Sequence, residues 1–209
     1  MMRIDSLSAA QDRAGKYKLQ LSDGTILKLY RQTIEDFGLY TGMEMTEEDF
    51  RKLKSSAGQM SAKMRAVRIV SASSISKSDL EQRLIHKGES SKDARDAVQW
   101  MTELDLVDDR KTAEQIIFNC IRKGYGISRA KQALYEKRIP RDLWPEVLTD
   151  YPDQKDKILS FLKSHLSDDA TDRDVRRVVE ALLRRGHSYS HIRHALTQLS
   201  LDSDTFPEE

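Results

Sequence analysis

Apolar positions recur at fixed spacings around three points in the chain, Gly88, Arg138 and Gly186. A leucine stands four residues before each point, and apolar residues also stand eight before, six after and ten after. In chain order these positions are Leu80, Leu84, Ala94, Val98, Ala130, Leu134, Trp144, Leu148, Val178, Leu182, Ile192 and Leu196. The points are 50 and 48 residues apart, which suits a three-helix unit. The pattern predicts a mainly α-helical protein, in which three tandem three-helix repeats form an elongated, curved molecule.

Residues 1–45 follow a different pattern, with the period of two that is typical of β-strands. Apolar and polar residues alternate over 17–21 and resume in strand-forming residues over 26–30, and a third strand is expected at 2–8. Because two or three strands alone are marginally stable in water, this sheet is expected to pack on neighbouring helices.

The connection between the first two of these runs contains Gly24. Leu19 and Leu21 can face Leu29 and Leu27 only if the connection has an odd number of residues. We therefore expect a bulged turn with Gly24 at positive φ.

Capping residues predict where the helices begin. Thr46 starts the helical part in a capping box with Asp49, and the helical period softens at Gly58 before it resumes. Pro145 is placed in the first turn of a helix that Asp142 caps. Further N-caps are expected at Ser76, Ser90 or Ser91, Asp108, Thr171, and Ser188 or Ser190.

These boundaries divide the chain into five parts. We expect a small N-terminal β extension at 1–45, helical repeats at 46–107, 108–151 and 152–201, and a flexible acidic tail at 202–209.

Charge is abundant but nearly balanced, with 35 basic and 34 acidic side chains among 209 residues. Net charge therefore does not identify a partner. The distribution of charge is uneven, because residues 1–50 carry 6 basic and 9 acidic groups whereas residues 51–100 carry 11 basic and 5 acidic groups.

No apolar run approaches the roughly 20 residues of a membrane span, and the start of the chain does not resemble a signal peptide. The single Cys120 is expected to be a buried thiol in a reducing compartment, so we predict a cytoplasmic protein. We also expect it to be a monomer.

Two groups of residues could in principle hold a metal ion. His187, His191 and His194 share one helix face, but no further ligand is evident, and three partly exposed imidazoles are the favoured alternative. Asp108 and Asp109 stand where a helix should begin, so capping is favoured over metal binding. No arrangement of nucleophile and base can be argued, so we expect neither enzyme activity nor a cofactor.

Several motifs together resemble RecX, the bacterial regulator of the RecA recombinase. The central repeat of that family is similar to Leu106-Val107-Asp108-Asp109, Ile121-Arg122-Lys123-Gly124-Tyr125-Gly126 and Lys131-Gln132-Ala133-Leu134. The first repeat resembles Ser76-Lys77-Ser78-Asp79-Leu80 with His86-Lys87-Gly88, and the third resembles Leu182-Leu183-Arg184-Arg185-Gly186-His187-Ser188-Tyr189. Arg138 departs from the pattern, since the family usually has glycine there.

The resemblance implies a regulator that binds the RecA filament on single-stranded DNA along its groove and contacts more than one protomer. It also implies that the regulator mostly inhibits recombinase, ATPase and coprotease activity. It implies a role in DNA repair, homologous recombination and the SOS response. Direct DNA binding by the helical units, with single-stranded DNA as a partner, is the alternative function. Basic side chains of the second and third repeats are the predicted partner-binding residues: Arg122, Lys123, Arg129, Lys131, Arg176, Arg177, Arg184, Arg185 and Arg193.

Overall fold

The protein is described by a computed structural model that covers residues 1–10, 15–167 and 170–199. In these residues it forms ten α-helices, one short 3-10 helix and a four-stranded sheet, so the mainly α-helical fold is confirmed. The chain divides into two compact units, Met1–Val107 and Asp108–Glu209. Within the described ranges, no helix is both long and apolar enough to cross a membrane. The predicted acidic tail at 202–209 lies outside the described residues.

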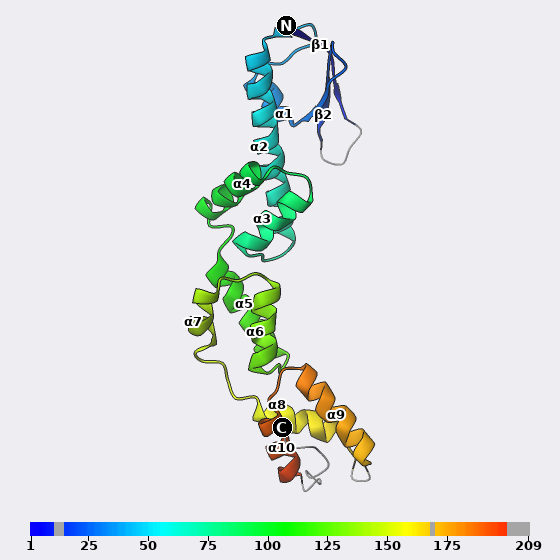
Figure 1. Cartoon of the computed structure of the whole chain (residues 1–209), viewed down its shortest axis with the longest axis vertical. Helices are drawn as coiled ribbons and strands as arrows, with labels where there is room; N and C mark the ends of the chain where they lie inside the picture. Colours follow the sequence, from blue (N-terminus) through cyan, green and yellow to red (C-terminus); the bar gives the residue numbers. More distant parts are fainter. Residues whose placement is uncertain (11–14, 168–169, 200–209) are drawn as a thin grey trace. The chain divides into compact units, whose positions relative to one another are not determined.

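The first unit begins with a sheet of strand order β3-β2-β1-β4, in which all neighbours are antiparallel. The strands are β1 (Met2–Ala9), β2 (Tyr17–Leu21), β3 (Ile26–Leu29) and β4 (Glu44–Met45). The expected third strand is thus present as β1. The short β4 and the helix α1 (Arg31–Asp36) were not predicted. The sheet lies beside α1 and the first part of α2 (Glu47–Ala72), as expected for so small a sheet (Figure 1).

The turn between β2 and β3 agrees with the prediction in length and conformation. Residues 22–25 lie between the two strands, and the hydrogen bond from Leu21 to Thr25 leaves the three residues 22–24 in the turn, where Gly24 has a φ of +86°. The predicted register is wrong by two residues, because Leu19 lies opposite Leu27 rather than Leu29. The amide of Leu21 donates a hydrogen bond of 2.9 Å to a carbonyl only four residues later, and this closure sets the register.

Helix α2 begins as predicted and continues further than predicted. The hydroxyl of Thr46 accepts from the amide of Asp49, whose carboxylate accepts from Thr46 in return. The expected softening at Gly58 is absent, since the helix runs unbroken to Ala72. A Cβ on Gly58 would lie 2.9 Å from the Oδ2 atom of Asp93. This glycine therefore permits a neighbouring helix to approach rather than breaking its own.

Two further helices complete the first unit. The hydroxyls of Ser76 and Ser90 cap α3 (Lys77–His86) and α4 (Ser91–Glu103), and Gly88 follows α3 with a φ of +92°. These two helices and the second half of α2 share one apolar core, and its most buried members are Ala62, Ala66, Leu80, Leu84, Ala94, Ala97 and Met101.

The second unit contains two apolar cores. Its helices are α5 (Asp109–Arg122), α6 (Ile127–Glu136), the 3-10 helix η1 (Arg141–Leu143), α7 (Trp144–Leu148), α8 (Lys155–His165), α9 (Asp172–Arg184) and α10 (Tyr189–Gln198). Leu134 is completely buried in the core that α5 and α6 form with α7, and Leu182 in the core of α8, α9 and α10. Asp108, Thr171 and Ser188 cap their helices as predicted.

The predicted cap at Asp142 is wrong. Asp142 already lies inside η1, and α7 follows directly with Leu143 as its N-cap residue and Pro145 in its first turn. A residue inside the 3-10 turn cannot also take the extended conformation of a capping residue. Trp144 and Leu148 are half-buried, while the residues at the matching offsets, Ala94, Val98, Ile192 and Leu196, are buried.

Arg138 takes the left-handed conformation that its counterparts Gly88 and Gly186 take, with a φ of +54°. A side chain in this conformation is strained, whereas glycine adopts it freely. We expect Arg138→Gly to raise the free energy of unfolding by about 0.5–1 kcal/mol, measured by urea denaturation. Lys137→Gly, at a φ of −90°, should lower it. Equal losses in both variants would contradict the strain at Arg138.

Candidate functional site

Two turns of the second unit touch through their backbones. The turn between α5 and α6 contains Gly126, whose N–H donates to the carbonyl of Arg185, between α9 and α10, at 2.9 Å. A Cβ on Gly126 would overlap the carbonyl of Gly186, and a Cβ on Gly186 would overlap the backbone of Arg129. We call this contact of Gly126, Arg185, Gly186 and Arg129 the glycine joint. It brings the ends of two helices that are far apart in the sequence to the same place.

His187 is buried next to the glycine joint, which corrects the expectation of a partly exposed ring. Its Nε2 atom lies 3.0 Å from the carbonyl oxygen of Gly124, and burial together with Arg185 lowers its pKa. His191 and His194 are exposed on α10. Among the described residues, no group of three or more His, Cys, Asp or Glu side chains could hold a metal ion.

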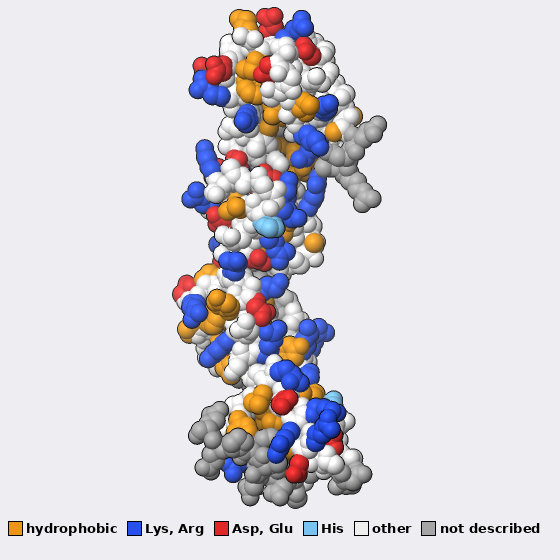
Figure 2. Space-filling view, turned by 45° about the vertical axis from the view of Figure 1, so that its right-hand side comes forward, with side chains coloured by type: hydrophobic (Ala, Val, Ile, Leu, Met, Phe, Trp, Pro, Cys, Tyr) orange, Lys and Arg blue, Asp and Glu red, His pale blue; other side chains and the backbone are white. Residues whose placement is uncertain are grey.

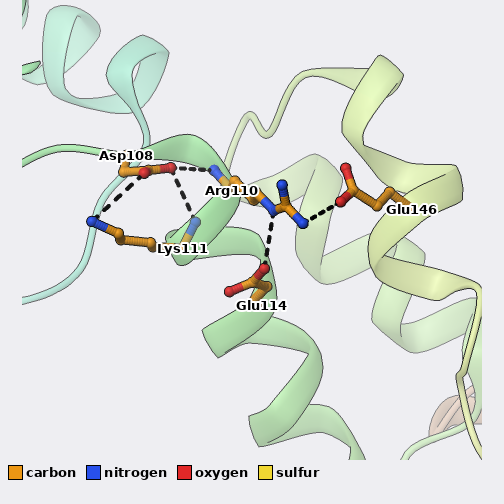
Figure 3. Close-up of polar contacts among 5 residues, drawn as sticks. All are labelled: Asp108, Arg110, Lys111, Glu114 and Glu146. Atoms are coloured by element: carbon orange, nitrogen blue, oxygen red, sulfur yellow. Dashed lines mark hydrogen bonds and ion pairs between the residues drawn. The ribbon is translucent and has the colours of Figure 1, made fainter.

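The two aspartates at the start of the second unit serve the helix that follows them. An oxygen of Asp108 accepts hydrogen bonds from the amides of Arg110 and Lys111 at 2.8 and 3.1 Å (Figure 3). The Arg110 guanidinium lies between Glu114, at 3.2 Å, and Glu146 of α7. Capping by Asp108 is therefore confirmed, and the surrounding charges join α5 to α7.

A small pocket beside the glycine joint gathers three of the predicted partner-binding residues. Arg122 and Lys123 come from the end of α5 and Arg185 from the end of α9, while α8 adds Lys157, Ser160, Phe161 and Ser164. We call this hollow the basic pocket. Its volume is about 200 Å³, below the range of about 300–1,000 Å³ that holds most cofactors and drug-sized ligands. It is therefore too small for most such ligands and has room for a single charged group.

Aromatic rings hold Arg185 in the basic pocket. Its Cζ atom lies 4.8 Å from the centroid of the Phe161 ring and 5.5 Å from that of Tyr125. Phe161 in turn stacks on His165 with 4.0 Å between ring centroids. The rings contact the face of the guanidinium, whereas its N–H donors point outward in its plane. The rings therefore position Arg185 and leave its donors available to an acceptor.

Lys157 was not among the predicted site residues. Its side-chain stem packs on the end of α5, since a Cβ on Gly124 would lie 3.4 Å from the Lys157 Cβ and Cγ atoms. Lys157 is one of three separate lysines in α8, and it lies outside the paired basic residues and the family motifs that suggested the other site residues. Only the packing of α8 against the end of α5 reveals that it belongs there.

The other predicted residues are not brought to the basic pocket. Arg129 forms an ion pair of 3.0 Å with Glu136, and Arg184 forms one of 3.6 Å with Glu180. The remaining four are exposed: Lys131 on α6, Arg176 and Arg177 on α9, and Arg193 on α10. Figure 2 shows lysine and arginine side chains spread over the visible face of the protein, with hydrophobic and acidic side chains among them.

The interior beneath the α5–α6 turn contains a buried thiol and a hydrogen-bonded tyrosine hydroxyl. Cys120 is buried, as predicted, and burial raises the pKa of its thiol. The hydroxyl of Tyr151 donates to the carbonyl of Tyr125 at 2.7 Å, and burial raises the pKa of Tyr151 to about 12. Both groups are therefore protonated near neutral pH and play a structural part.

The fold and the basic pocket define a helical protein with a charged surface site. No family model matches the chain. It is similar to the regulatory protein RecX of Vibrio parahaemolyticus, with 26% identity over 147 residues that cover 69% of this chain and 95% of the relative. It is also similar to the regulatory protein RecX of Clostridioides difficile, with 24% identity over 204 residues that cover 87% of this chain and 94% of the relative.

Solved structures agree with these relatives. A crystal structure of regulatory protein RecX matches with a TM-score of 0.61 and 19% identity, and the match covers 93% of this chain and all of the other. The structure of RecX from Lactobacillus salivarius matches with a TM-score of 0.59 over 69% of this chain and 98% of its own. The fold is thus shared, and the curated relatives confirm the resemblance to the RecX family.

Proposed function

We propose that this protein is a regulator of the RecX type, which binds the RecA filament on single-stranded DNA along its groove and inhibits its activities. The observation that carries the proposal is the similarity to RecX regulatory proteins over 87% of the chain, together with a shared fold over 93% of it. The parts named in the sequence analysis, from the N-terminal extension through three helical repeats, belong to this proposal. Its proposed location is the cytoplasm.

The proposed mode of action is occupation of filament surface, without chemistry by the regulator itself. The small basic pocket and the exposed arginines of α9 offer charged contacts to a large partner. Guanidinium groups make paired hydrogen bonds with carboxylates and phosphates alike. The nine basic residues predicted from the sequence are therefore proposed to contact acidic RecA surface or phosphates in the filament.

Titration of RecA with the purified protein tests this function. RecA-catalysed ATP hydrolysis on single-stranded DNA should fall as the protein is added, and saturate when the filament sites are filled. Unchanged hydrolysis, together with no co-sedimentation of the protein with RecA filaments, would refute the proposal.

Direct DNA binding by the helical units is the second candidate, and the basic pocket is the observation that favours it. Binding through phosphates weakens steeply as salt rises, whereas a mixed protein interface is less sensitive. If the protein inhibits RecA only at concentrations that coat the free DNA, the second candidate is the better description.

Arg176 and Arg177 provide a clean test of the proposed interface, because both are exposed on α9. Arg176→Glu/Arg177→Glu should raise the concentration for half-inhibition of RecA by about tenfold, since two favourable charges become repulsive. Stability should change by less than about 0.5 kcal/mol per exposed substitution. Charge reversal at Arg184 and Arg185 is a less specific test, because it would also remove the contacts of Arg185 with Tyr125 and Phe161.

The matched control is Arg51→Glu/Lys52→Glu, an equal charge change at exposed positions of α2 in the first unit. This control should inhibit like the wild type. If the α9 double variant is folded and inhibits at the wild-type concentration, these two arginines lie outside the interface.

A further inference from the structure

The basic pocket concentrates positive charge without balancing it. Arg122, Lys123, Lys157 and Arg185 all line it, and no carboxylate is among its lining residues. Within the described ranges, none of the four forms an ion pair. Like charges that share a hollow repel one another, and an anion placed among them removes that repulsion.

Helix ends explain some of these charges but not all. Arg122 and Lys123 end α5, and Arg185 follows the last residue of α9, where a cation interacts favourably with the helix dipole. Lys157 lies in the first turn of α8, where the same dipole opposes a cation. Its place in the basic pocket therefore calls for another explanation.

Several features prepare the basic pocket for an anion. The rings of Tyr125 and Phe161 hold the Arg185 guanidinium in place, so little rotational freedom is lost when it binds. Packing on Gly124 positions the stem of Lys157. The exposed Ser160 adds a hydroxyl that can donate a hydrogen bond.

We propose that the basic pocket binds a phosphate group of single-stranded DNA. This inference rests on direct DNA binding, the second candidate under the proposed function, and deepens it by naming the chemical group that is bound and the residues that bind it. The volume of about 200 Å³ fits one such group and leaves the base and sugar outside. A polynucleotide carries one negative charge at every nucleotide. The four neighbouring cations can therefore contact one phosphate in the pocket and attract the adjacent phosphate of the same strand. An acidic protein segment would need an equally dense run of carboxylates.

Lys157→Gln tests the site in the absence of RecA. Binding of the full chain to a fluorescein-labelled oligodeoxythymidylate is followed by fluorescence anisotropy between about 50 and 200 mM salt. The variant should bind roughly fivefold more weakly, and the slope of log affinity against log salt should be less steep by about 0.7, as for one lost phosphate contact on a single strand. Because a phosphate contact does not read bases, the loss should be the same on oligodeoxycytidylate.

Lys163→Gln is the matched control, since Lys163 is exposed on the same helix and does not line the pocket. It should bind DNA like the wild type, and both variants should show the wild-type circular dichroism spectrum. Equal affinities for the two variants, or no binding by the wild type, would overturn the inference. Inhibition of RecA by the wild type would in either case leave the proposed function standing.

A parallel assay of RecA ATP hydrolysis separates DNA from an acidic protein segment as the occupant. If Lys157→Gln loses inhibition while its affinity for single-stranded DNA is unchanged, the pocket receives a carboxylate of the partner and the inference is wrong. If DNA affinity and inhibition fall together, the phosphate assignment is supported.

Discussion

Leu84→Ala, Leu134→Ala and Leu182→Ala should each lower the free energy of unfolding by about 2–5 kcal/mol. The three leucines occupy equivalent positions of the three proposed repeats, and none exposes more than 1% of its surface. Truncation removes three carbon atoms from a packed interior and leaves a cavity that the neighbouring helices fill only in part. Urea denaturation followed by circular dichroism measures the loss for the unit that carries each residue.

Leu183→Ala is the control for this series. Leu183 follows Leu182 directly in α9 but is 43% exposed, so the same truncation should cost well under 1 kcal/mol. A loss below about 0.5 kcal/mol at two of the three buried leucines would mean that the repeat register is wrong.

The sequence predicts these helices well because each is specified by local chemistry. Thr46, Ser76 and Thr171 are followed three residues later by aspartates whose amides they bind, and Gly88 and Gly186 end the preceding helices at positive φ. Such caps and the apolar period act within one helix. They can therefore be read without knowledge of the partner that the helix packs against.

Structural features that depend on residues far apart in the sequence are not predicted correctly from the sequence. Gly58 is a residue type that often breaks a helix, but here it marks the point where α4 approaches α2 closely. The strand β4 has two residues and exists only through its pairing with β1. The register of β2 and β3 follows from the turn closure, which the alternation of apolar residues does not determine.

The candidate site likewise has residues that the sequence predicts and residues that only the packing of distant elements reveals. Paired basic residues and family motifs indicated Arg122, Lys123 and Arg185, and the structure places these three in one pocket. Lys157 joins them only because α8 packs on the end of α5. The sequence also gave no sign that His187 would be buried, since its partner is the carbonyl of Gly124, 63 residues away.

Substitutions in the glycine joint should separate the cost of close approach from the cost of backbone strain. Gly126 has an ordinary φ of −75°, so Gly126→Ala introduces only the overlap of a Cβ with the carbonyl of Gly186. Gly88 has a φ of +92° and no atom near its would-be Cβ, so Gly88→Ala introduces only left-handed strain. Gly186→Ala introduces both, because its φ is +84° and its Cβ would overlap Arg129.

We expect Gly88→Ala to lower the free energy of unfolding by about 1 kcal/mol, the strain of a left-handed alanine. Gly126→Ala should cost more, about 2–3 kcal/mol, because two backbones must move apart and the hydrogen bond from Gly126 to Arg185 is broken or lengthened. Gly186→Ala should cost about 3–4 kcal/mol, the sum of both effects. Urea denaturation of the three variants supplies the comparison. If Gly126→Ala is no more destabilising than Gly88→Ala, the two turns do not pack as closely as described, and the arrangement of the basic pocket beside them is wrong as well.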